Sequence, residues 1–142
     1  MKSTKEIGEK IVEKLVALES AEDVKLFREV KRYSFARLSP ETFPNDLLKL
    51  KMPTCLVVMA ADTNDGKPTK REINWILVLA FKGTEEAAGD ACTNAIDMIR
   101  AQVLGQALFD KVNLRPTSKL SMQESTAAYT GAALTCVTVE HA

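Results

Sequence analysis

Cysteine and histidine are the residue types in this chain best suited to nucleophilic or metal chemistry. The chain has three cysteines, Cys55, Cys92 and Cys136, each in an apolar stretch, and one histidine, His141. A structural zinc site needs four such ligands, usually in closely spaced pairs, and neither CxxC nor HxxxH spacing occurs here. Free cysteine is among the residue types most often buried. The sequence therefore predicts three reduced, buried thiols and no metal site.

Carboxylates and hydroxyls form no clearer catalytic pattern. Residues 62–66 read Asp-Thr-Asn-Asp-Gly, which is similar to the start of a calcium loop, but the later ligands are missing. A hairpin turn explains this stretch better. The sequence has no GxSxG elbow and no glycine-rich phosphate or dinucleotide loop. We therefore expect no catalytic residues, no cofactor and no enzyme activity.

Charge and length narrow the class of partner. The chain has 142 residues, with 19 basic and 19 acidic side chains and 46% hydrophobic residues, as expected for one soluble domain. Proteins that bind nucleic acids usually have a basic excess, so zero net charge disfavours that function. The longest apolar runs have seven residues, whereas a membrane-spanning helix needs about 20. We expect a soluble protein made in a reducing compartment.

One segment, 25–37, departs from this balance. It has five basic residues against Glu29 alone, with Tyr33 and Phe35 close by: Lys25, Arg28, Lys31, Arg32 and Arg37. One interpretation is a small basic, aromatic patch for nucleic acid or an acidic partner. The other, favoured by the neutral chain, is a half-exposed strand with charged outer positions.

The secondary structure follows from hydrophobic periodicity and end signals. Ser3 and Glu6 have the spacing of a capping box, and Thr84 has the context of an N-cap. The pattern predicts helices over 4–19 and from 84 to about 104, and strands over 24–35, 54–60, 71–82, 112–122 and 129–140. Pro116 makes 112–122 an irregular edge strand. Residues 38–53 are expected to be a loop, with at most one helical turn at 47–50.

The two strands 54–60 and 71–82 form a predicted β-hairpin. In the second strand Ile73, Trp75, Leu77, Leu79 and Phe81 alternate onto one face, which makes Trp75 a core residue. The whole order predicts one α+β domain over 1–142. Its expected architecture has two layers, with a mixed or antiparallel sheet of four to five strands packed by two main helices.

The order and residue patterns of these elements resemble those of the small tail-terminator and minor tail proteins of bacteriophages and prophages. The similar features are an amphipathic opening helix, a Pro-preceded apolar strand, a long strand that leads into a helix, an Arg-Pro element and a closing strand, at 7–18, 52–58, 73–81, 85–104, 114–116 and 132–140. The resemblance implies a homo-oligomer, a hexameric ring that caps the tail tube and meets the head connector. It also implies a host-cytoplasmic location during assembly, then the virion tail, and no catalytic residues. A small regulatory or partner-binding module and an enzyme subunit are the competing classes.

A ring-forming protein needs surfaces that reach its neighbours, and the irregular segments 38–52 and 62–70 are the candidates. The first has more apolar residues than a solvated loop needs. The second has mixed charges suited to setting register and partner choice. The predicted interface residues are Phe43, Leu47, Lys67, Lys70 and Arg71. The alternative for Leu47 and Leu50 is that they pack on the core of their own subunit.

Overall fold

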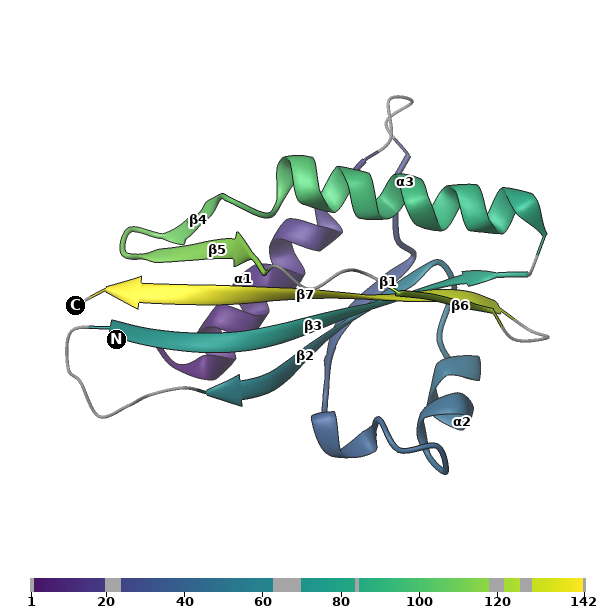
Figure 1. The fold of residues 1–142 in the computed structure, drawn as a ribbon, viewed down its shortest axis with the longest axis horizontal. Helices are drawn as coiled ribbons and strands as arrows, with labels where there is room; N and C mark the ends of the chain where they lie inside the picture. Colours follow the sequence, from purple (N-terminus) through teal and green to yellow (C-terminus); the bar gives the residue numbers. More distant parts are fainter. Residues whose placement is uncertain are drawn as a thin grey trace.

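The fold is centred on one curled, mixed β-sheet (Figure 1). The computed structural model describes residues 2–19, 24–62, 70–83, 85–117, 122–125 and 129–141. The strands are β1 (Glu29–Tyr33), β2 (Thr54–Asp62), β3 (Lys70–Lys82), β4 (Ala107–Phe109), β5 (Val112–Pro116), β6 (Met122–Ser125) and β7 (Tyr129–His141). Their order is β1-β2-β3-β7-β5-β4, and β6 pairs with β7. The helices are α1 (Thr4–Val16), α2 (Phe43–Leu48) and α3 (Glu86–Gln102), with a short 3-10 helix at Phe35–Arg37.

The predicted two-layer α+β domain, with four to five strands and two main helices, is wrong. The described strands form a seven-stranded sheet that curls into a half-barrel, and three α-helices pack around it. The prediction lacked α2, β4 and β6, and β1 runs parallel to β2. Parallel neighbours need a crossover connection, and this crossover includes α2. It places α2 on the opposite face of the sheet from α3 (Figure 1).

The inner face of the sheet forms the larger core. Residues of β3 and β7 that alternate onto this face pack with α1 and α3, including Trp75, Leu77, Leu134 and Cys136. Helix α1 contacts β1, near one edge of the curled sheet, and also β4 at the other. Trp75 is 2% exposed, so its predicted place in the core is confirmed.

The outer face of the sheet has a second, smaller core. Leu56, Val58 and Ala80 are buried there beneath Leu47 of α2. Phe43 and Tyr33 lie against the same cluster, with their rings edge to face at 5.9 Å. The segment predicted as a loop over 38–53 is therefore a helical cover for half of the outer face.

The opening helix begins where the sequence indicates. Ser3 accepts a hydrogen bond from the Glu6 backbone N–H, and Glu6 Oε1 accepts one from the Ser3 N–H, which confirms the capping box. The helix ends at Val16 rather than at 19. Helix α3 begins at Glu86, with Glu85 as N-cap, and the predicted cap Thr84 lies outside the described residues.

Strand β5 differs from the expected irregular edge strand. It lies between β7 and β4 and pairs with both. Pro116 is the last residue of β5. At a strand end, the missing backbone N–H disrupts the hydrogen bonds between strands least. Residues 107–109, at the end of the predicted helix, form the edge strand β4 instead. Strands β2 and β3 pair antiparallel as predicted, with a register shift between Met59 and Ala61.

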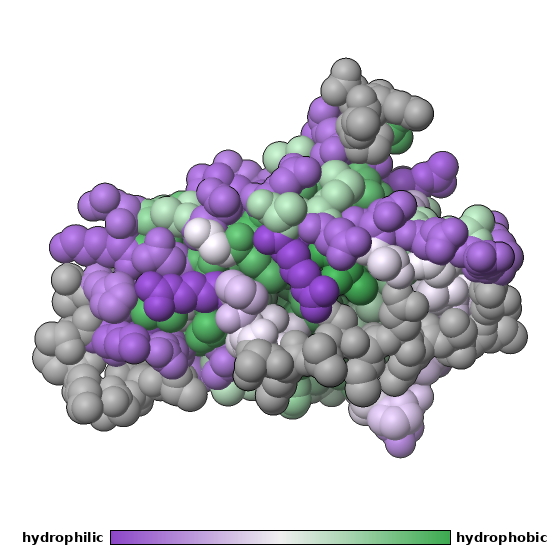
Figure 2. Space-filling model, turned by 45° about the horizontal axis from the view of Figure 1, so that its top comes forward, coloured by the Kyte–Doolittle hydropathy of each residue, from purple (hydrophilic) through white to green (hydrophobic). Residues whose placement is uncertain are grey.

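The described surface is mainly polar. In Figure 2 most of the described residues on the visible face are hydrophilic, and hydrophobic residues can be seen between them near the middle of the face. None of the helices in the described ranges is long and apolar enough to cross a membrane.

Candidate functional site

At the ends of β2 and β3 that flank the predicted surface 62–70, the described residues form a charged cluster. Arg71 Nη2 donates to Asp62 Oδ2 at 2.6 Å and to Thr4 Oγ1 at 2.8 Å. Its Nη1 donates to the Lys2 carbonyl at 3.0 Å. The Asp62 carboxylate is the main reason that the pKa of Arg71 lies above its usual value. Arg71 thus connects the start of the chain to two strands of its own subunit.

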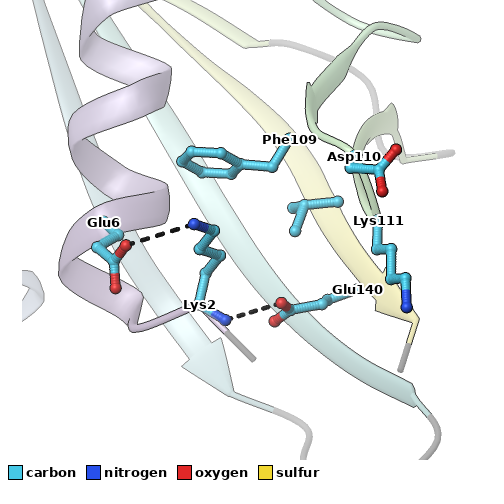
Figure 3. Close-up of a pocket in the computed structure, with 7 residues that line it drawn as sticks. Lys2, Glu6, Phe109, Asp110, Lys111 and Glu140 are labelled. Atoms are coloured by element: carbon cyan, nitrogen blue, oxygen red, sulfur yellow. Dashed lines mark hydrogen bonds and ion pairs between the residues drawn. The ribbon is translucent and has the colours of Figure 1, made fainter.

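A hollow of about 430 Å³ lies beside this cluster (Figure 3). Lys2, Glu6, Phe109 and Glu140 line it, with Lys2 Nζ 4.7 Å from the centre of the Phe109 ring and 3.8 Å from Glu6 Oε2. Glu140 is only 5% exposed. Its Oε2 accepts a hydrogen bond from the Lys2 backbone N at 2.8 Å, and its buried Oε1 has no partner among the described residues. The hydrogen bond from the Lys2 backbone N–H to Glu140 therefore joins the N-terminal segment to β7.

These contacts indicate that Arg71 stabilises the fold of its own subunit. Arg71→Ala should lower the free energy of unfolding by about 1–2 kcal/mol, because it breaks charge-assisted hydrogen bonds of a largely buried guanidinium. Lys70→Ala is the matched control, since Lys70 is exposed and its ion pair, 3.0 Å to Glu72, is also at the surface. Urea denaturation of both variants measures the difference. Equal stability of the two variants would contradict a structural role for Arg71.

The predicted surface at 38–52 is divided between the core and the solvent. Leu47 is 1% exposed and Leu48 is 62% exposed. Phe43 is half-buried against the outer-face cluster. Leu47 therefore packs on its own subunit, which was one of the two alternatives. Lys67 lies outside the described residues. Of the other four predicted interface residues, Phe43 and Leu47 lie at the outer-face cluster, and Lys70 and Arg71 lie at the start of β3.

The segment after β1 is fastened to α2 by an ion pair that the sequence did not indicate. Arg37 Nε and Nη2 donate to Asp46 Oδ2 and Oδ1 at 2.7 and 3.0 Å. The Tyr33 hydroxyl donates to Asp46 Oδ2 at 2.6 Å. The hydrogen bonds from Arg37 and Tyr33 lower the pKa of Asp46 from 3.8 to about 2. Tyr33 has a raised pKa, first because it is desolvated and then because of Asp46.

This ion pair predicts a defined acid dependence. A carboxyl with a depressed pKa stabilises the fold when ionised, so its contribution is complete above about pH 4 and is lost as the pH falls towards about 2. In Asp46→Asn that part of the pH dependence should disappear. Thermal unfolding followed by circular dichroism from pH 5 to about pH 2 measures it. An unchanged slope in the variant would show that Asp46 is not the group responsible.

The three thiols lack the properties of reactive cysteines. Cys55, Cys92 and Cys136 are all buried, which confirms their predicted placement. Burial raises the pKa of all three, that of Cys136 to about 12. A thiol becomes nucleophilic as the thiolate, so these cysteines are poorly suited to catalysis. In the described ranges no three His, Cys, Asp or Glu side chains come together as metal ligands.

The surface along β1 has the strongest concentration of one charge type. Strand β1 is the end of the strand order and pairs, among the described strands, only with β2. Five exposed basic side chains flank it: Arg28, Lys31 and Arg32 in or beside the strand, and Lys49 and Lys51 after α2. The sequence indicated the first three, but Lys49 and Lys51 join them only because the crossover returns to this edge. The exposed ring of Phe35, 54% accessible, and the side chain of Leu48 lie on the same crossover.

No protein-family model matches the chain, and no curated protein matches it either.

Proposed function

We propose that the chain is a structural tail protein of a bacteriophage or prophage, of the tail-terminator type. In this proposal it forms a homo-oligomeric ring that caps the tail tube and joins it to the head connector. It works through binding surfaces and needs no catalytic residues, cofactor, membrane contact or direct contact with nucleic acid. The order of elements that suggested the tail-terminator resemblance supports the proposal.

The observation that carries the proposal is the open edge of the sheet at β1. An unpaired edge strand is a template for association, and most monomeric proteins protect such edges. Here exposed cations lie along the edge, and the crossover that leads from β1 to β2 exposes Phe35 and Leu48. Exposed aromatic residues beside arginines are typical of binding surfaces between proteins.

A small partner-binding module is the second candidate. An apolar hollow of about 280 Å³ between α2 and the outer face of the sheet favours it. Leu38, Phe43, Ile76, Val78 and Tyr129 are among the residues that line the hollow. A hollow of this kind would accommodate an apolar side chain of a different partner or a small apolar ligand.

Sedimentation velocity over a wide range of protein concentration separates the two candidates. A ring-forming protein should change from small species to one larger, discrete species as the concentration rises. Negative-stain electron microscopy of that species should then show closed rings. A chain that stays monomeric at every concentration, and whose melting temperature rises with an apolar ligand, would favour the partner-binding module and contradict the proposal.

A further inference from the structure

The basic charges of this neutral chain are concentrated on the crossover side of the sheet. Between residues 24 and 51 there are seven basic residues and three acidic ones, a net charge of +4. Lys25 pairs with Glu19 and Arg37 pairs with Asp46. The other five, Arg28, Lys31, Arg32, Lys49 and Lys51, are exposed and form no ion pair with another described residue.

Acidic residues outnumber basic ones on α3 and its N-cap. Between residues 85 and 102 there are four acidic residues and one basic residue, Arg100, a net charge of −3. Glu86, Asp90 and Asp97 are exposed, and their spacing of four and seven residues places them on one stripe of the helix. The stripe faces away from the core, because the buried residues of α3, such as Cys92 and Ile99, lie on the opposite side.

The other segments have smaller net charges, the largest being −2 over residues 1–23. A solvated surface usually has both signs interspersed. Among the described residues, none of the three stripe carboxylates forms an ion pair with a cation of the β1 edge. Two oppositely charged surfaces that do not pair within one molecule are complementary between two copies.

We infer that the basic β1 edge of one copy binds the acidic stripe of α3 on a second copy. The carboxylates would pair with the lysines and arginines, and the helix would cover the open edge, which is one way that proteins protect an edge strand. The contact joins two different surfaces, so it is head to tail, and such contacts close into rings when the rotation between copies allows it. The inference deepens the proposed ring and rests on that proposed function.

Charge reversal on each surface, followed by mixing, tests this contact. The edge-reversed variant has Arg28→Glu with Lys31→Glu, and the stripe-reversed variant has Glu86→Lys with Asp90→Lys. Each variant alone replaces attractive charge pairs in the contact by repulsive ones, so its self-association should weaken at least tenfold. An equimolar mixture should associate again, because the unchanged basic edge of the stripe-reversed variant meets the unchanged acidic stripe of the edge-reversed variant. Sedimentation velocity at low salt measures all three samples.

Two controls keep the test decisive. Lys5→Glu with Lys82→Glu makes the same change in net charge on exposed residues elsewhere, and it should associate like the parent chain. The parent chain itself should associate more weakly as sodium chloride is raised, because salt screens the contact; this readout needs no variant to fold.

The outcomes distinguish this interface from the proposed function. If the parent chain assembles but the folded variants assemble equally well, or their mixture does not recover, the β1–α3 contact is wrong while the ring proposal stands. If the parent chain never assembles, the proposed function fails, and this inference fails with it. Salt-independent assembly of the parent would also overturn the contact.

Discussion

Replacement of Trp75 by alanine should lower the free energy of unfolding by about 3–5 kcal/mol, the range for large aromatic residues removed from a core. The indole lies on the inner face of β3, and its Nε1 donates to Thr138 Oγ1 on β7 at 2.9 Å. Helix α1 approaches it closely at Gly8, where an added Cβ would lie 3.2 Å from the ring. Alanine would leave a cavity beneath α1 that the curled sheet is poorly able to close. Guanidinium denaturation measures the effect.

Thr138→Val is the control for this prediction. It keeps the volume near Trp75 but leaves the indole N–H without its acceptor, which should cost about 1–3 kcal/mol. The ratio of the two effects separates the packing of the ring from its hydrogen bond. A near-neutral Trp75→Ala variant that had lost self-association would show that this face of β3 is an interface rather than core.

Leu47→Ala should lower the free energy of unfolding by about 2–5 kcal/mol, whereas Leu48→Ala should change it by less than about 0.5 kcal/mol. The two leucines are adjacent, but Leu47 is buried against Leu56, Val58 and Ala80 while Leu48 faces solvent. The pair is therefore its own matched control for helix propensity and residue type. Urea denaturation with constant m-values measures both.

The same pair tests the association surface. Under the proposed function Leu48→Ala weakens self-association without loss of stability, because Leu48 is exposed on α2. If Leu48→Ala destabilised the fold as strongly as Leu47→Ala, α2 would not be placed as described. If it changed neither stability nor association, Leu48 would lie outside the contact.

Local patterns predicted the elements of this fold better than their arrangement. The capping box at Ser3 and Glu6 and the alternation around Trp75 depend on neighbours along the chain, and both are correct. The parallel pairing of β1 with β2 depends on a contact between distant segments, and no local pattern encodes it. One available signal was the apolar second face of β3, since Ile76, Val78 and Ala80 need a cover of their own.

The candidate surfaces also depend on contacts between distant segments, which local patterns do not reveal. Arg71 was predicted at an interface from its place in a mixed-charge turn, but its partners Lys2 and Thr4 are nearly seventy residues away in sequence. Lys49 and Lys51 join Arg28 and Lys31 only through the crossover. Charge runs along a sequence do not reveal which charges share a face until the topology is known.

The central claim is that this chain functions by assembly with its own copies, and native mass spectrometry tests it most directly. The measurement uses the purified chain at low ionic strength over a series of concentrations. If the chain forms the proposed ring, the spectra should show a species with the mass of six chains. Its abundance should rise with protein concentration and fall as salt is added. A single mass of one chain throughout, at concentrations where the protein is folded, would contradict the claim.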